Sequence, residues 1–197
     1  MIDEKRFKTT PVQHIRNLLN SIKDGKLTIT YYNEMSEPTD TITYDVSCTA
    51  ADADEFISKY EALTKALYAI GKSREKLESE AKIEDVLTPD QIDVWNTYFW
   101  DFDKDFDAGE YSLGELYAKL WNELELSEEE NAVLERYDEW FDEQCLKHLP
   151  SKTRHPRFLV SCARRYQHFV SRNAPQIILD HDGCLLAEQM ILFYSAK

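Results

Sequence analysis

The chain has 197 residues, of which 43% are apolar and 12% aromatic, and 37 acidic against 23 basic residues give it a formal net charge of −14. This length allows one domain with a sizeable core, and the aromatic content argues against an acidic disordered chain. No run of 18 apolar residues or signal-peptide pattern is present, and the negative charge disfavours membranes and nucleic-acid phosphates as partners, so we expect a cytoplasmic protein.

Four segments carry the side-chain pattern of a helix start. Thr10 and Thr88 are each followed by proline and, two residues further on, by glutamine, whereas Ser112 and Ser127 are each followed three residues later by glutamate. In this pattern the hydroxyl oxygen accepts a hydrogen bond from a free backbone N–H, and the later side chain reaches back to the backbone. The sequence therefore predicts helices that begin near residues 11, 89, 113 and 128, and the Asp-Gly pair at 24–25 predicts the end of the first.

Two segments, 26–33 and 40–47, alternate in polarity and are rich in β-branched and aromatic residues. A polar stretch that contains Pro38 separates them, so they predict an antiparallel β-hairpin. Because two strands alone are only marginally stable, we expect the hairpin to pack on a helix or to pair with a third strand.

Further helical segments complete the fold. Residues 51–69 place large apolar side chains on one stripe, which Gly71 interrupts. Two further helices are predicted, at 156–172 and in the apolar segment after Pro175. We therefore predict an α+β fold, mainly helical, with about six helices and one small antiparallel β-hairpin. Residues 1–82 hold the first helix, the hairpin and a long helix, and residues 83–197 hold the acidic helices, a basic helix and a C-terminal helix. We expect the two parts to form one compact unit. The predicted stripe consists of Phe56, Tyr60, Leu63, Leu67 and Ile70.

Charge is distributed unevenly along the chain. Residues 84–143 carry 20 acidic side chains against three basic ones, whereas residues 147–172 carry seven basic side chains and no acidic one. The basic helix could pack beside the acidic one and neutralise part of it, or it could contact nucleic acid directly. Seven positive charges cannot cancel a surplus of 17, so we expect a negative surface to remain. The basic side chains that could contact nucleic acid are Arg154, Arg157, Arg164, Arg165 and Arg172.

Aspartate alternates with other residues, mostly aromatic, over 100–107. If this segment is extended, the carboxylates share one face at a spacing of about 6.6 Å, which is of the order of the phosphate spacing along a nucleic-acid strand. The alternative is an acidic loop after a frayed helix end, with its aromatic side chains in the core. The acidic residues of this run are Asp101, Asp103, Asp105 and Asp107.

A second acidic block lies on the helix that begins near 128. Glu135, Asp138, Glu139 and Asp142 lie off its apolar stripe, which indicates a solvated face or a binding surface. Trp140 lies among these acidic residues, and we expect it to be exposed, where it could hold an arginine or lysine of a partner.

Residues 103–115 resemble the calcium loop of the EF-hand family. Asp103, Asp105 and Asp107 match its first three acidic positions, and Gly109 and Glu115 match its glycine and final glutamate if one inserted residue is allowed. The resemblance implies that these four carboxylates bind calcium, the one cofactor that the sequence suggests. The insertion lies at the turn of the loop, which departs from the family pattern.

Two resemblances concern the function of the whole chain. Arg164-Arg165-Tyr166 and Asn173-Ala174-Pro175, followed by 185–188, look like the C-terminal ends of small accessory proteins from Gram-positive mobile elements. In charge and size the chain resembles the acidic inhibitors by which phages and plasmids block restriction and CRISPR nucleases, the anti-restriction and anti-CRISPR class.

No nucleophile elbow, phosphate-binding loop, dinucleotide glycine motif or H-E-x-x-H motif is present, so we expect a binding protein and no enzyme. The leading hypothesis is a nucleic-acid mimic that occupies the basic channel of a bacterial nuclease. The alternatives are a calcium-binding structural module and a nucleic-acid-binding accessory protein. The predicted contacts to the nuclease are Asp101, Asp103, Asp105, Asp107, Glu135, Asp138, Glu139, Asp142 and Trp140.

Overall fold

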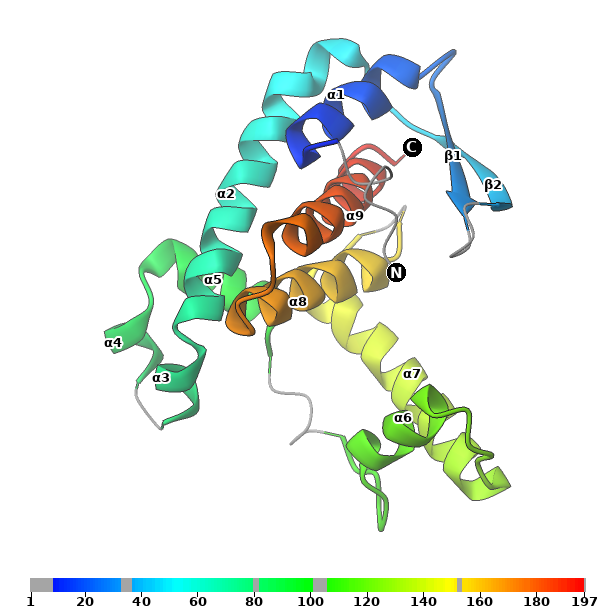
Figure 1. The fold of residues 1–197 in the computed structure, drawn as a ribbon, viewed down its shortest axis with the longest axis vertical. Coiled ribbons are helices and arrows are strands. Elements are labelled where there is room, and N and C mark those ends of the chain that lie inside the picture. The colour runs from blue at the N-terminus through cyan, green and yellow to red at the C-terminus, as the bar shows by residue number, and fades with distance from the viewer. Residues whose placement is uncertain (1–8, 33–36, 80–81, 101–105, 152–153, 197) are drawn as a thin grey trace.

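The computed structural model describes residues 9–32, 37–79, 82–100, 106–151 and 154–196. Within these ranges the chain is mainly helical, with nine α-helices, one 3₁₀ turn and one antiparallel hairpin, so the predicted α+β class is confirmed (Figure 1). The elements in chain order are α1 (Pro11–Ser21), β1 (Lys26–Tyr32), β2 (Pro38–Asp45), the 3₁₀ turn η1 (Ala50–Asp52), α2 (Ala53–Lys72), α3 (Arg74–Glu78), α4 (Ile83–Val86), α5 (Pro89–Tyr98), α6 (Leu113–Trp121), α7 (Glu128–His148), α8 (Arg157–Ser171) and α9 (Gln176–Tyr194).

The predicted number of about six helices is too low. Two of the additional helices are α3 and α4, of five and four residues, which form after α2. A helix this short has no repeating apolar stripe and gains little from its own hydrogen bonds, so nothing in the sequence pattern marks it. The four predicted helix starts are confirmed. The Ser127 hydroxyl oxygen accepts from the Glu130 N–H at 3.2 Å, and the Ser127 N–H donates to the Glu130 carboxylate at 3.0 Å.

The Asp24-Gly25 pair does not end the first helix as predicted. α1 ends at Ser21, and Asp24 and Gly25 both adopt positive φ angles, of 52° and 70°. The backbone groups of Lys23 and Lys26 pair across them at 2.9 and 3.0 Å, which makes a two-residue turn leading into β1. Two consecutive positive φ angles define a type I′ turn, and Asp-Gly is among its preferred sequences.

The hairpin is confirmed, and α9 and the C-terminal residues support it. β1 and β2 pair antiparallel with Ile29 opposite Ile42, and Tyr31 donates from its hydroxyl to Glu188 of α9 at 3.3 Å. The Ser47 N–H, just after β2, donates to the Ser195 carbonyl at 2.7 Å. The expected support for two otherwise marginal strands therefore comes from a buried helix and a short backbone bridge.

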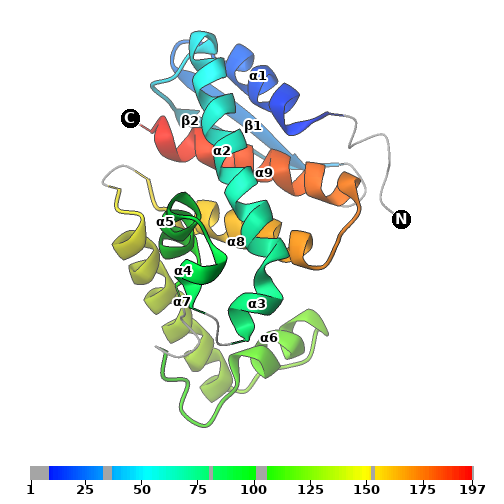
Figure 2. The same cartoon turned by 90° about the vertical axis from the view of Figure 1, so that its left-hand side faces the viewer.

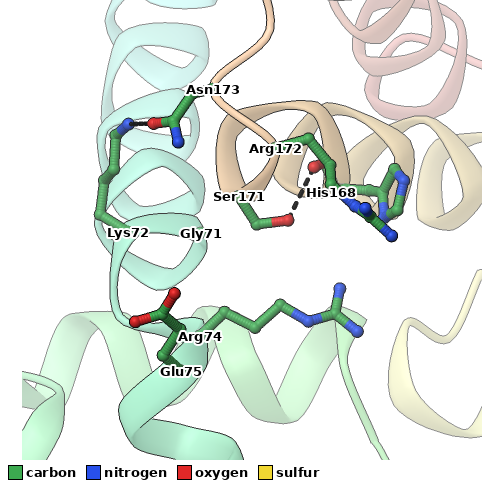
Figure 3. Close-up of a pocket in the computed structure, with 8 residues that line it drawn as sticks. All are labelled: Gly71, Lys72, Arg74, Glu75, His168, Ser171, Arg172 and Asn173. Atoms are coloured by element: carbon green, nitrogen blue, oxygen red, sulfur yellow. Dashed lines mark hydrogen bonds between the residues drawn. The ribbon is translucent and has the colours of Figure 1, made fainter.

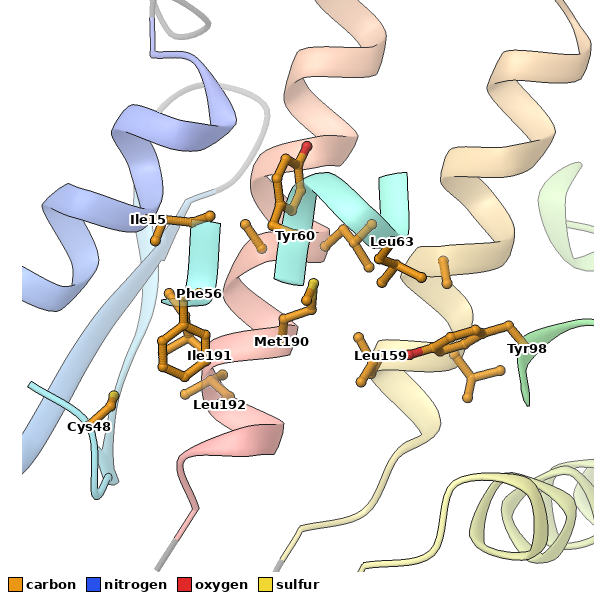
Figure 4. Close-up of a cluster of buried hydrophobic side chains, with 14 of the residues drawn as sticks. Ile15, Cys48, Phe56, Tyr60, Leu63, Tyr98, Leu159, Met190, Ile191 and Leu192 are labelled. Carbon is orange, nitrogen blue, oxygen red and sulfur yellow. The ribbon is translucent and has the colours of Figure 1, made fainter. Parts of the chain in front are cut away.

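α9 lies at the centre of the fold, where α1, α2 and α8 pack against it (Figure 1 and Figure 2). Leu186, Ala187 and Ile191 are fully buried, and nine α9 residues are buried in all. The predicted stripe of α2 is buried as well, and its Phe56, Tyr60 and Leu63 meet Met190 and Ile191 in the core (Figure 4). Because α9 buries several of its faces, it follows no clean amphipathic period.

The prediction that Gly71 interrupts the long helix is also wrong, since α2 continues through Gly71 to Lys72. A Cβ at this position would lie 2.8 Å from Val170 Cγ1 and 3.0 Å from the Gln167 carbonyl oxygen. The glycine therefore serves the close packing of α2 on α8 and does not end the helix.

Replacing Gly71 with alanine should lower the free energy of unfolding by about 1–3 kcal/mol, because the added methyl group overpacks the contact with Val170. Urea unfolding of Gly71→Ala, Val170→Ala and the double variant measures this. We expect the two changes to be non-additive, since alanine at 170 removes Cγ1, the nearest atom to the new methyl group, while Cβ at 2.9 Å and the Gln167 carbonyl oxygen at 3.0 Å limit the relief. Additive losses would contradict the proposed contact.

Candidate functional site

A segment rich in acidic residues projects from the molecule. It is here called the acidic arm and is defined as residues 106–148. It contains α6 and α7, which lie at the end of the molecule away from α1 and the hairpin (Figure 1 and Figure 2). The arm carries 13 acidic residues and only Lys119, Arg136 and Lys147 as basic ones. α7 alone has 21 residues, a length of about 31 Å at the rise of an α-helix.

Aromatic side chains pack α6 and the residue Phe106 against α7 within the acidic arm. The ring of Tyr137 lies 5.2 Å from that of Phe106 and 6.1 Å from that of Tyr117, between centroids, in edge-to-face arrangements. Val133, Tyr137, Phe141 and Cys145 form the buried stripe of α7. This packing fixes the direction of the remaining α7 side chains, among them the acidic ones.

Trp140 belongs to this packing, so the prediction of an exposed anchor is wrong. It is half-buried, with its ring 5.6 Å from that of Phe106 and 6.0 Å from that of Tyr137. Tyr137 and Trp140 are three residues apart and therefore neighbours on the helix surface, where Phe106 covers both.

The four predicted acidic contacts on α7 fall into two groups. Glu135 and Glu139 are exposed and form no ion pair among the described residues. Asp138 and Asp142 accept hydrogen bonds from Arg157 of α8, at 2.7 and 3.1 Å. The basic helix thus neutralises one edge of α7, as the alternative interpretation of the charges predicted, and leaves the other edge uncompensated.

Glu135, Glu139 and Glu143 are spaced by four residues and form a line of exposed carboxylates, here called the α7 strip. Glu143 extends the predicted set along the same line. At the start of α7, hydrogen bonds from the Lys119 side chain and the Ser127 backbone lower the pKa of Glu130, so this carboxyl group is ionised at neutral pH as well.

The structure describes only part of the aspartate-aromatic run, residues 100–107. Asp101, Asp103 and Asp105 lie outside the described residues, so their predicted common face stays a prediction. Asp107 is exposed, and its Oδ1 accepts a hydrogen bond from the Gly109 N–H at 2.9 Å. Gly109 adopts a φ of 66°, which glycine reaches without strain.

The predicted calcium site stays a prediction for the same reason, since two of its four carboxylates are outside the described ranges. Glu115 is exposed in the first turn of α6, where its N–H donates to Ser112 Oγ at 3.5 Å. No group of three or more potential metal-ligating histidine, cysteine or acidic side chains is found in the part of the chain that the structure describes.

The basic segment does not form one basic face. The Arg154 guanidinium lies 4.4 Å from the ring centroid of Tyr44, and Arg164 donates to the carbonyl oxygens of Tyr98 and Trp100. Arg165 pairs with the buried Asp182 of α9 at 2.7 Å. Most of the arginines proposed as nucleic-acid contacts therefore make contacts within the fold, and Arg172 lies in a pocket, which is considered below.

The four cysteines, Cys48, Cys145, Cys162 and Cys184, are free, and none has an activated thiol. Burial raises the pKa of Cys145 and Cys184 to about 12 and that of Cys162 to about 11, so these thiols stay protonated at neutral pH. A protonated thiol is a weak nucleophile and a poor metal ligand.

A groove with a volume of about 830 Å³ lies between α2 and α5 and was not predicted from the sequence. Leu63, Ala66, Val94 and Met190 form its apolar floor, and Lys59 and Asp90 are among the charged groups at its rim. These residues come from three distant parts of the chain, so no local pattern could have indicated the groove.

Comparison of the chain with protein-family models, curated proteins and solved structures found no match. Among the helices of the described ranges, none has both the length and the apolar character needed to cross a bilayer.

Proposed function

We propose that this chain is an acidic inhibitor, a non-enzymatic binding protein whose acidic arm occupies the basic nucleic-acid channel of a bacterial nuclease. The nuclease would be a CRISPR or restriction enzyme, which places the interaction in the cytoplasm. The observation that carries the proposal is the α7 strip, a line of exposed carboxylates on a helix that projects from the fold, with no ion pair to any residue that the structure describes.

Two further features support the arm as the binding surface. The aromatic packing of Phe106, Tyr117 and Tyr137 holds α6 and α7 together, so the carboxylates are presented on an ordered support. A preorganised array loses less conformational entropy on binding than a flexible acidic tail. Asp107 and the predicted contacts in 101–105 would extend the surface beyond α7.

The mechanism is competition for a channel that binds phosphates. A channel lined by lysine and arginine attracts a surface of opposite charge over long range, so association is fast and weakens as salt rises. Asp138 and Asp142 would contribute less, because Arg157 already compensates their charge.

Reversing the α7 strip tests the proposal. We expect the triple variant Glu135→Lys, Glu139→Lys and Glu143→Lys to lose about a hundredfold in affinity for the target nuclease and to stop inhibiting DNA cleavage. Its folding should be unchanged, since these side chains are exposed. The measurement is a cleavage assay on a panel of purified CRISPR and restriction nucleases, at about 50 mM and about 300 mM salt.

The matched control reverses three exposed acidic residues outside the arm, Glu61, Glu84 and Asp85, and so has the same net charge as the triple variant. It should inhibit like the unmodified protein. Absence of inhibition across the panel, or equal loss of inhibition in both triple variants, would contradict the proposal.

A further inference from the structure

A second surface feature has the opposite charge from the acidic arm. It is a pocket of about 390 Å³ where the C-terminal ends of α2 and α8 meet (Figure 3). Its lining includes Lys72 and Arg74 from one end, and His168, Arg172 and Asn173 from the other. These two groups of residues are about a hundred positions apart in the chain, so only the packing of α2 on α8 brings them together.

Positive charge dominates this pocket. Lys72, Arg74 and Arg172 line it against a single carboxylate, Glu75. Figure 3 shows the Arg74 side chain extending away from Glu75, toward the side of the pocket where Arg172 and His168 lie. A concentration of three cations is unusual on a chain with a net charge of −14.

Two of the three cations are not neutralised within the fold. Lys72 donates from Nζ to Asn173 Oδ1 at 2.5 Å, a neutral acceptor, and neither Lys72 nor Arg172 has a carboxylate partner among the described residues. Helix C-termini attract cations, which accounts for Lys72 at the end of α2 and Arg172 at the end of α8. It does not account for Arg74, which extends to the side of the cavity where Arg172 and His168 lie.

Burial and the positive charges of the pocket lower the pKa of the His168 imidazole. Burial has the larger effect, and the charges of Arg172 and Arg74 lower the pKa further. The imidazole is therefore largely neutral at neutral pH and would gain a proton more easily if an anion entered the pocket.

We propose that this pocket binds the phosphate group of a small phosphorylated ligand. Figure 3 shows the Arg74 and Arg172 side chains on the same side of the pocket, and guanidinium groups match the geometry of phosphate oxygens. The volume is at the lower end of the range for small-molecule sites, so it accommodates a phosphate with a compact attached group.

An NMR titration of the His168 ring with inorganic phosphate, and separately with AMP, tests the proposal. We expect saturable binding and a rise in the pKa of His168, because bound negative charge offsets Arg172 and Arg74. Phosphate alone should produce the full rise if the pocket recognises only the anion, whereas tighter binding of AMP would identify a phosphomonoester as the ligand class. Chloride at equal ionic strength provides the baseline.

The variants Arg172→Ala and Arg74→Ala should each weaken phosphate binding at least tenfold. Arg16→Ala, which removes one positive charge from an exposed ion pair with Asp54, should leave it unchanged. An unchanged pKa of His168 with both phosphate and AMP, or equal binding by the pocket variants and by Arg16→Ala, would overturn the proposal. This test is independent of nuclease inhibition, since the pocket lies outside the acidic arm.

Discussion

Replacing Arg164 with alanine should lower the free energy of unfolding by about 3 kcal/mol. Arg164 is half-buried, donates to the carbonyl oxygens of Tyr98 and Trp100 at the end of α5, and lies 4.4 Å from the ring centroid of Trp100. Its removal would leave carbonyl groups that α5 itself cannot satisfy and would take a cation from an aromatic cluster that includes Phe141. The urea midpoint of Arg164→Ala measures the loss.

Two variants separate this role from charge alone. Arg164→Lys keeps the charge but cannot donate to two carbonyl groups in the same forked geometry, so it should recover less than half of the loss. Arg172→Ala removes an arginine from the end of the same helix and should change the unfolding free energy by less than about 0.5 kcal/mol. Equal stability of Arg164→Ala and Arg172→Ala would show that Arg164 does not hold α5 on α8.

The elements that were predicted correctly carry their signals locally. A helix start depends on a cap and a residue three positions later, and the hairpin on alternating polarity, so a short stretch of sequence contains the whole pattern at Ser127 or in 26–33. The short helices α3 and α4 have no such signal, because neighbouring elements and not their own periodicity stabilise them.

The roles of the charged residues could be predicted only in part. The sequence shows that seven basic residues follow an acidic helix, but not which carboxylate each one meets. Arg157 pairs with two aspartates of the acidic arm, Arg165 pairs with a residue of α9, and Arg172 lies in a pocket with residues of α2. These partners depend on how helices far apart in the chain pack, which local spacing does not encode. For the same reason Trp140, which looks exposed among acidic neighbours, is half-buried against Phe106.

Removing Arg165 should have a large and pH-dependent effect. Asp182 is only 3% exposed, its Oδ1 pairs with Arg165 Nη2 at 2.7 Å, and its Oδ2 is buried with no hydrogen-bond partner among the described residues. Loss of the partner of a buried charge costs about 3–5 kcal/mol, and because the Arg165 side chain is half-exposed we expect about 2–3 kcal/mol for Arg165→Ala near neutral pH.

The sign of the pH dependence follows from the pKa of Asp182. Burial raises this pKa, and Arg165 partly opposes the rise, so the Arg165→Ala variant should have a still higher folded-state pKa. A raised pKa means that stability is complete below the unfolded-state value and falls as pH rises through the folded-state value. The deficit of the variant should therefore be larger at about pH 8 than at about pH 5, because a falling pH favours the protonated, uncharged form of Asp182.

A double variant isolates the unpaired carboxylate as the cause. Adding Asp182→Asn to Arg165→Ala removes the buried charge, so it should recover at least half of the lost stability and abolish the dependence of the deficit on pH. Arg16→Ala disrupts an ion pair of 2.9 Å with the exposed Asp54 and should cost less than about 0.5 kcal/mol at either pH. If the deficit of Arg165→Ala were the same at both pH values, or if Asp182→Asn recovered nothing, the loss would come from packing of the arginine stem and not from a buried carboxylate.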